Sequence, residues 1–343
     1  MRPVSSSLVC WIKTVLLVLA AIVVTVLLTT RPARAETQVG FQLVQVPDPQ
    51  GTPIEVGIWY PTATVATLPV PGLGDALLAP NSPLLGQGLP LVVMSHGNGG
   101  WFGGHHDTAE TLARAGFVVA ALTHTHDNFR DQSRSTDLAS RPRQLRVLVD
   151  YMLADWPQHG QLDPGRVGAF GFSAGGLTVL VAAGGELELA RVPAHCRSHP
   201  THFDCRLMAL QPPPADALAA PWIHDARIKA VVSAAPALGY AFRPESLGAI
   251  TVPVQLWRAE NDQILVDPFH ATTILQALPG TPDVHVVQGA GHYDFLTPCP
   301  PGMARELPQL CSSAPGFDRA AFHLTFNREI TAFFTANLPP KQP

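Results

Sequence analysis

Short apolar runs alternate with segments of helical character along most of the chain. The runs have the length of buried strands, and the segments between them carry helical periodicity or helix-end signals. The expected strands are 89–94, 117–122, 167–170, 228–233, 252–257 and 284–287, and the expected helices are 107–115, 141–156, 174–183, 272–278 and 319–338. Strands that alternate with helices predict a mostly parallel sheet with helices on both faces.

Three regions depart from this alternation. Residues 39–46 and 54–60 flank a turn-rich link and predict an antiparallel hairpin. Residues 61–88 are rich in Pro, Gly, Leu and Ala and carry one charge, Asp75, so we expect an irregular apolar loop at the site entrance. Residues 184–225 hold two cysteines and a Pro-Pro-Pro run, which predicts a disulfide-pinned cap insertion with little regular structure.

The first 35 residues predict a signal peptide. Arg2 and Lys13 are basic, and an apolar run extends over 15–28. Ala-Arg-Ala then fits the small-x-small cleavage pattern, so cleavage is expected after Ala35. A retained membrane anchor is the alternative, although the run is short for a membrane span. The 46% hydrophobic content of the 343-residue chain is ample for one large domain over residues 36–343.

The net charge and the number of cysteines indicate which binding partners and which redox compartment to expect for the protein. The first 35 residues hold four of the 22 basic residues and none of the 26 acidic ones, which leaves 18 basic against 26 acidic and a formal net charge of −8. This balance, without a basic cluster, predicts no nucleic-acid partner. Four cysteines remain, and an even number in an exported protein predicts disulfides. Their spacing favours two local bridges, Cys196–Cys205 and Cys299–Cys311.

The stretch 166–176, R-V-G-A-F-G-F-S-A-G-G, carries the most specific chemical signal. It contains the G-x-S-x-G pattern of a nucleophile elbow, in which a serine stands on a sharp strand-to-helix turn. Side chains two residues before and after the serine would collide with neighbouring backbone, which explains the glycines. The apolar strand before it and the small-residue helix after it favour Ser173 as a nucleophile.

A glycine-rich loop, S-H-G-N-G-G at 95–100, follows an early strand. In hydrolases with an elbow, such a loop supplies one oxyanion donor and the residue after the nucleophile supplies the other. We therefore predict the backbone N–H groups of Asn98 and Ala174 as oxyanion donors. His96 is expected to hold the loop by hydrogen bonding.

Two later loops supply the base and the acid that a serine nucleophile needs. Asp262 and His292 each follow a predicted strand, in the chain order serine, acid, histidine that is expected for an elbow hydrolase. Glu260 is the alternative acid. Asp294 is expected to be too close in sequence to His292 to orient it.

Two groups of histidines raise a metal hypothesis. They are His105, His106, His124 and His126 in the first half of the chain, and His195, His199 and His202 in the cap insertion. The first group lacks the i, i+4 or facial-triad spacing of known sites, and the second is a similarly weak candidate. We therefore predict no metal ligand set and no cofactor.

Six stretches are shared with one group of enzymes. They are I-W-Y-P at 58–61, S-H-G-N-G-G at 95–100, T-H-D-N at 125–128, G-F-S-A-G-G at 171–176, A-G-H-Y-D-F-L at 290–296 and F-D-R-A-A-F-H at 317–323. On these stretches the chain resembles the secreted α/β-hydrolases grouped as dienelactone-hydrolase-like proteins, and their relatives the platelet-activating-factor acetylhydrolases. The resemblance extends over 39–338 and implies an α/β-hydrolase fold and ester hydrolysis. Dienelactone hydrolases use a cysteine nucleophile where this chain has Ser173, so that activity does not carry over.

These features predict an exported serine carboxylic-ester hydrolase, periplasmic or extracellular, that acts through an acyl-enzyme. Ser173 attacks the carbonyl, His292 acts as base and then as acid, and Asp262 holds the imidazole. The expected substrate is a small-molecule or lipid ester, with no stable membrane insertion after signal cleavage. A lipase- or phospholipase-type acylhydrolase and a non-catalytic binding protein on a hydrolase scaffold are the alternatives.

Overall fold

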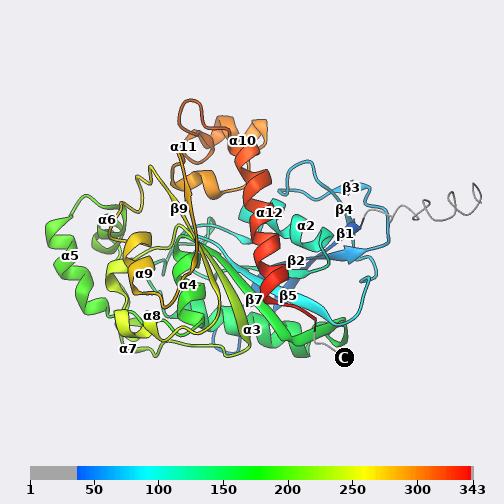
Figure 1. The fold of residues 1–343 in the computed structure, drawn as a ribbon, viewed down its shortest axis with the longest axis horizontal. Coiled ribbons are helices and arrows are strands. Elements are labelled where there is room, and N and C mark those ends of the chain that lie inside the picture. Colours follow the sequence, from blue (N-terminus) through cyan, green and yellow to red (C-terminus); the bar gives the residue numbers. More distant parts are fainter. Residues whose placement is uncertain (1–36, 341–343) are drawn as a thin grey trace, which may run out of the picture. The chain divides into compact units, whose positions relative to one another are not determined.

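One mostly parallel sheet forms the centre of the described chain (Figure 1). The computed structural model describes residues 37–340. The strands of this part are β1 (Gln38–Val46), β2 (Ile54–Thr62), β3 (Leu68–Pro69), β4 (Leu77–Pro80), β5 (Leu89–Ser95), β6 (Val118–Thr123), β7 (Leu162–Phe172), β8 (Ile228–Ala234), β9 (Val254–Ala259) and β10 (Asp283–Val287). They hydrogen-bond in the order β10-β9-β8-β7-β5-β6-β2-β1-β4-β3.

The strand directions confirm the predicted fold class. The six strands from β10 to β6 run parallel, and β1 and β2 form the expected antiparallel hairpin that joins β6 at one side. This arrangement is that of the α/β-hydrolase fold. β5 and β7 are neighbours, with Ser95 opposite Gly171, so the loops that leave their carboxyl ends start side by side. In open α/β sheets, sites form at this edge of the strands.

Helices cover both faces of the sheet, as the alternation predicts. The α-helices of the described residues are α2 (His106–Arg114), α3 (Ser140–Ala154), α4 (Ala174–Ala182), α5 (Val192–Ser198), α6 (Phe203–Leu210), α7 (Ala215–Ala219), α8 (Pro244–Gly248), α9 (Ala271–Ala277), α10 (Pro301–Glu306), α11 (Pro308–Cys311) and α12 (Arg319–Asn337). The 3₁₀ helices are η1 (Phe102–His105), η2 (His159–Gln161), η3 (Leu189–Arg191), η4 (Gly239–Ala241) and η5 (His292–Phe295).

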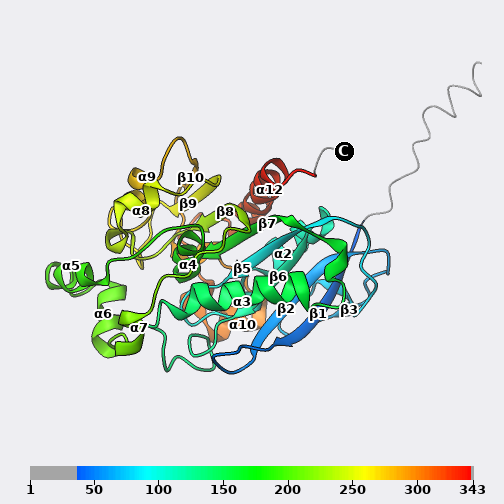
Figure 2. The same ribbon diagram turned by 90° about the horizontal axis from the view of Figure 1, so that it is seen from below.

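The apolar core lies in two layers, one on each side of the sheet. Val93 and Ala169 belong to the layer that contains the apolar residues of α3, α4 and α9, whereas their chain neighbours Val92 and Phe170 belong to the layer with α2 and α12. Successive strand residues point to opposite faces, which accounts for the division. Figure 2 shows α3 and α12 on opposite sides of the sheet.

Local signals fix the helix ends that the sequence analysis expected. Gly116, just after α2, has φ of 97°, the left-handed conformation with which glycine commonly ends a helix. At the start of α12, the Asp318 side chain accepts a hydrogen bond from the N–H of Ala321 at 3.0 Å. Such an N-cap satisfies one of the free donors of the first turn.

The region 61–88 is more regular than the sequence predicted. β3 and β4 pair with each other, and β4 also pairs in parallel with β1, with Gly40 opposite Ala79. Leu73 and Leu78 are fully buried. The prediction of a wholly irregular loop was wrong because a composition rich in Pro and Gly does not exclude short strands, and proline is tolerated at the ends of edge strands.

The insertion 184–225 is also more regular than predicted. It contains α5, α6 and α7, so the expectation of little regular structure was wrong. These helices bury few apolar side chains, and a disulfide between Cys196 and Cys205 joins α5 to α6. A covalent link can hold two short helices that have too little apolar surface to show a clear periodic pattern.

The predicted signal peptide and its cleavage site after Ala35 lie outside the described residues. Within residues 37–340, the helices are too short or too polar to cross a bilayer.

Candidate active site

The turn from β7 to α4 is built around one residue in an unusual conformation, Ser173. Its φ is 58°, a left-handed value that residues other than glycine seldom adopt. A Cβ on Gly171 would lie 2.0 Å from the carbonyl oxygen of Gly175, and a Cβ on Gly175 would lie 1.9 Å from that of Ser95. Both positions therefore require glycine. The N–H of Ser173 donates to the carbonyl of Ala234 at 2.9 Å and helps to hold the strained turn.

Three side chains from separate loops form one continuous hydrogen-bonded chain. Nε2 of His292 lies 3.1 Å from Oγ of Ser173, and Nδ1 of His292 lies 2.7 Å from Oδ2 of Asp262. Oδ1 of Asp262 accepts the backbone N–H groups of Ile264 and Leu265, which leaves Oδ2 for the imidazole. Ser173 is 8% and His292 4% exposed, so these groups interact largely out of bulk water.

The two other carboxylates considered as acids have different partners. Glu260 accepts a hydrogen bond from the N–H of Gly289 at 2.8 Å. Asp294 accepts from the N–H of Gly291 at 2.8 Å, and its other oxygen faces Arg319. Of these three carboxylates, Asp262 is the one that bonds to His292.

The glycine-rich loop after β5 lies against Ser173. A Cβ on Gly97 would be 3.2 Å from Cβ of Ser173, so the Gly97–Asn98 peptide lies beside the serine. The N–H of Asn98 makes no hydrogen bond within residues 37–340. Ala174 is the first residue of α4, and an N–H at that position has no carbonyl partner within its own helix. Two free backbone donors at this place can receive a negatively charged oxygen.

A buried ion pair braces the same loop. Arg141, in the first turn of α3, pairs with Asp127 and also donates to the carbonyl of His96. Asp127 in turn accepts from the N–H of Gly99 and from Nδ2 of Asn98, each at 2.9 Å. Burial raises the pKa of Asp127, and the adjacent guanidinium opposes this shift. The ion pair therefore anchors both sides of the loop that carries a candidate oxyanion donor.

His96 holds the loop, as the sequence analysis expected. Its Nδ1 lies 2.6 Å from the carbonyl oxygen of Gly97, and its Nε2 accepts the N–H of His124 at 2.9 Å. Burial lowers the pKa of both histidines well below the usual range, so both rings are neutral. His96 thus acts as a fixed bridge between the ends of β5 and β6.

A second buried network positions the loop that carries His292. Asp294, within η5, faces the guanidinium of Arg319 at 3.0 Å. His323 joins the same network: its Nε2 lies 2.9 Å from the carbonyl oxygen of Asp294 and its Nδ1 lies 2.6 Å from Asp107. Burial acts to raise the pKa of Asp107, but the hydrogen bonds from His323, Thr297 and Asn327 and the charge of His323 together outweigh burial and hold that pKa below its usual value.

The second disulfide is tied to this network. Cys299 and Cys311 are bonded to each other, as their spacing predicted. Arg319 donates to the carbonyl oxygens of Leu310 and Ser312, the residues on either side of Cys311. The loop closed by this bridge is therefore connected to Asp294 through one guanidinium.

The sequence analysis missed the residues that brace the two loops. Arg141 and Arg319 are nearly buried, yet neither was given a role in the site: Arg141 was assigned to a predicted helix, and Arg319 to a predicted helix and a stretch of family resemblance. One sequence signal could have indicated a buried arginine, namely a charged residue in a predicted helix with an apolar residue one turn further along. Asp127 and His323 lie in stretches that the sequence analysis used for the family resemblance, and neither residue was given a role in the site.

The four histidines of the first group do not meet at one point. His105 is buried against the rings of Phe170 and Phe172. The other three have separate partners, namely His106 with Glu110, His124 with Ser95 and Gln144, and His126 with Asp131. Within residues 37–340, the groups of side chains close enough to share a metal ion contain none of these four.

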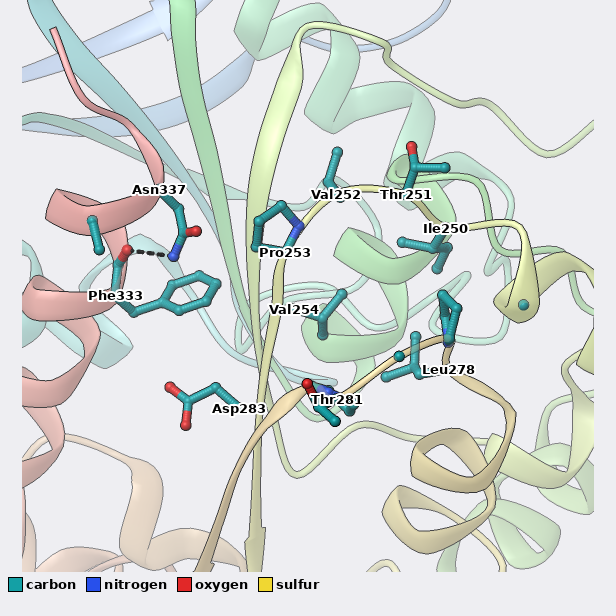
Figure 3. Close-up of a pocket in the computed structure, with 15 residues that line it drawn as sticks. Ile250, Thr251, Val252, Pro253, Val254, Leu278, Thr281, Asp283, Phe333 and Asn337 are labelled. Carbon is teal, nitrogen blue, oxygen red and sulfur yellow. Dashed lines mark hydrogen bonds between the residues drawn. The ribbon is translucent and has the colours of Figure 1, made fainter.

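A pocket of about 770 Å³ (Figure 3) lies at the amino ends of β9 and β10, whereas the candidate active site lies at the carboxyl ends of the strands. Val252, Pro253 and Val254 line it at the start of β9, and Asp283 does so at the start of β10. Ser173 stands at the carboxyl end of β7, which is parallel to these strands. This pocket is therefore separate from the candidate active site.

Comparisons with known proteins agree with the fold. No protein-family model and no curated protein matches the chain, so the resemblance to dienelactone-hydrolase-like proteins stays a prediction. Among solved structures, the ferulic acid esterase from Streptomyces cinnamoneus is similar, with 17% sequence identity and a TM-score of 0.56 over 92% of this chain and 95% of that one. At this identity the likeness establishes a shared fold alone.

Proposed function

We propose that this chain is an exported serine carboxylic-ester hydrolase. The observation that carries the proposal is the continuous hydrogen-bonded chain from Asp262 through His292 to Ser173, on a strained turn beside free backbone donors. A nucleophile, a base within reach and an acid that orients the base are the parts needed for acyl transfer. The ester class is supported by the similar fold of a ferulic acid esterase.

The reaction has two halves that use the same groups. Oγ of Ser173 attacks the ester carbonyl and passes its proton to Nε2 of His292, while the carbonyl oxygen takes the negative charge and faces the N–H groups of Asn98 and Ala174. His292 then gives the proton to the departing alcohol. Water attacks the acyl-enzyme with His292 again as base, and the acid leaves when Oγ recovers its proton. Asp262 keeps Nδ1 protonated and stabilises the imidazolium.

The domain arrangement is part of the same proposal. Residues 1–35 act as a cleaved signal peptide, residues 36–343 form one hydrolase domain, and 184–225 is a cap insertion. The contacts of Gln211 favour the interpretation of the insertion as a cap. Gln211 donates to the carbonyls of Gln132 and Ser133, and the Gln132 side chain lies against Gly99 in the glycine-rich loop. Two disulfides suit an oxidising compartment. On this account, the chain is related to the dienelactone-hydrolase-like group.

A lipid acylhydrolase is the second candidate. Several large apolar side chains of the region 61–88 are exposed, namely Val65, Leu68, Leu77 and Leu85. Exposed apolar side chains that gather in one region suit contact with acyl chains. The same triad chemistry would then act on a long-chain ester.

Hydrolysis of p-nitrophenyl esters of increasing acyl length tests the proposal and separates the two candidates. We expect turnover by the wild type that is lost in Ser173→Ala, because the alanine variant lacks the nucleophile. Ser198→Ala removes an exposed hydroxyl in α5 and is expected to leave the rate unchanged. A preference for long chains would favour the lipid candidate. Equal activity in wild type and Ser173→Ala would refute the serine-hydrolase proposal, and ester binding without turnover in either would favour a binding protein.

A further inference from the structure

Three ligand-type side chains of the insertion converge on one point. His195 lies in the last turn of α5, His202 is the residue before α6, and Asp204 is in its first turn. One ring nitrogen of each histidine and one carboxylate oxygen lie within 4.8 Å of one another. Asp204 is 5% exposed, so the group is built around a buried carboxylate.

Each of these three side chains carries a buried polar atom without a partner in the part of the chain that the structure describes. Nε2 of His195, Nδ1 of His202 and Oδ1 of Asp204 are buried and make no hydrogen bond within the described residues. Buried polar atoms are nearly always paired, so three orphans in one place call for a ligand. Tyr240 donates to the other oxygen, Oδ2, of Asp204 at 2.6 Å. That bond fixes the carboxylate and leaves Oδ1 available for a ligand, as outer hydrogen bonds do for ligating carboxylates.

The Cys196–Cys205 disulfide holds the segments that carry these side chains close together. Cys196 follows His195 and Cys205 follows Asp204, so the bridge joins the two segments that carry these side chains. Both sulfurs are used in this bond, which leaves nitrogen and oxygen as the available ligand atoms. A covalent link at this place reduces the conformational freedom that a metal site must otherwise restrict.

We propose that His195, His202 and Asp204 bind a zinc ion. Two imidazoles and one carboxylate are ligands that Zn²⁺ accepts in a tetrahedral site, whereas Mg²⁺ and Ca²⁺ prefer oxygen alone. The fourth position is filled by water or by His199, whose ring centroid lies 4.7 Å from those of both histidines.

The proposed zinc site lies next to the segment 237–240, which contacts the candidate nucleophile. Tyr240 belongs to η4, and in the segment before it the N–H of Ala237 donates to the carbonyl of Ser173 at 3.1 Å. Zinc would thus hold α5 and α6 together, and the hydrogen bond from Tyr240 to Asp204 connects this unit to the segment that supports the elbow. Its role is structural, and the proposal does not depend on the esterase function.

Zinc chloride titrated into the intact protein tests the site. The buffer contains no reductant, so that free thiols cannot contribute ligands, and competition with a chromophoric chelator gives stoichiometry and affinity. We expect one zinc per chain, a rise in melting temperature with Zn²⁺ but not with Mg²⁺ or Ca²⁺, and affinity at least about tenfold weaker in His202→Ala. His224→Ala, an exposed histidine of the same insertion, serves as the matched control and should bind like the wild type.

Asp204→Asn covers the case in which His202→Ala fails to fold, because it changes the ligand charge with little change in shape. Cobalt substitution adds a spectroscopic readout, since four-coordinate Co²⁺ absorbs strongly in the visible range and the band should be lost in both ligand variants. No zinc bound to folded wild type, or affinity unchanged in folded His202→Ala and Asp204→Asn, would overturn the site. So would an equal loss in His224→Ala.

Discussion

The carboxylate of Asp294 and the guanidinium of Arg319 form a buried ion pair, with Oδ1 of Asp294 3.0 Å from Nε of Arg319 and exposures of 2% and 7%. The pair lies two residues beyond His292, and the second oxygen of Asp294 accepts the N–H of Gly291, the residue before that histidine. The ion pair therefore fixes both ends of the short segment that presents the imidazole to Ser173.

Replacement of Arg319 by methionine is expected to damage both stability and activity. It leaves Asp294 buried without a partner, which destabilises folded proteins by about 3–5 kcal/mol. Arg328→Met serves as the control, because Arg328 lies on the exposed side of the same helix and pairs with Glu329 at the surface. Such exposed pairs contribute about 0–1 kcal/mol. Urea unfolding and kcat for a soluble ester measure the difference, and equal effects of the two variants would contradict the positioning role.

Replacement of Arg141 by lysine is expected to lower kcat more than it changes KM. Lysine keeps the charge but cannot contact Asp127, His96 and Thr178 at once as the guanidinium does. The N–H of Asn98, the proposed oxyanion donor, would then be misplaced, and small misplacement of such groups costs up to about 100-fold in rate. Arg146→Lys, exposed on the same helix, should behave like the wild type. A change confined to KM would argue against this role for Arg141.

Buried histidines are expected to make the protein sensitive to mild acid. Burial lowers the pKa of His105 to about 3 and of His270 to about 4. Below a pH of about 6.5 the unfolded chain takes up protons on these rings while the folded chain does not, so the free energy of unfolding falls as pH falls. Each such group contributes up to about 1.4 kcal/mol per pH unit between its unfolded and folded pKa values.

His105→Leu isolates one of these groups. Neither ring nitrogen of His105 makes a hydrogen bond within the described residues, and the negative charge of Asp107 offsets only part of the effect of burial on the pKa of this ring. Leucine cannot titrate, so the loss of stability between pH 6.5 and 5 should be smaller than in the wild type. Urea midpoints at several pH values test this, and an unchanged slope would count against the explanation.

The two disulfides are expected to differ in their effect on activity. Their cysteines are 9 and 12 residues apart, and closing loops of this size contributes about 3 kcal/mol each in the chain-entropy model. Loss of Cys299–Cys311 should lower kcat more, because Arg319 bonds to both neighbours of Cys311. Double Cys→Ser variants at each bridge, compared by melting temperature and kcat, give the answer. A larger loss of kcat on removal of Cys196–Cys205 would contradict this ranking.

The sheet and its long helices could be predicted because their signals are local. The apolar run before Ser173 and the glycines around it describe a buried strand and a tight turn, and both need only neighbouring residues to specify them. The hairpin of β1 and β2 was readable for the same reason. Chain order and position after a strand fit Asp262 and Glu260 alike, and the hydrogen bond to His292 that separates them is a contact that the sequence does not encode.

The ion pairs and hydrogen bonds that position the loops of the site could not be predicted, because they join residues that are not neighbours in the sequence. Arg141 meets Asp127 across 14 residues, and His323 meets Asp107 across 216. No periodic pattern encodes such pairs. The helices of the insertion were missed for a related reason, since a disulfide holds them with little apolar burial.

Covalent labelling by a p-nitrophenyl alkylphosphonate tests the central claim, that Asp262, His292 and Ser173 act as one unit. The account predicts a single adduct on the peptide that contains Ser173. It also predicts labelling slowed by orders of magnitude, to about 10⁴-fold, in Asp262→Asn, and labelling near the wild-type rate in Glu260→Gln. An adduct on another residue, or equal labelling rates in the two acid variants, would contradict it.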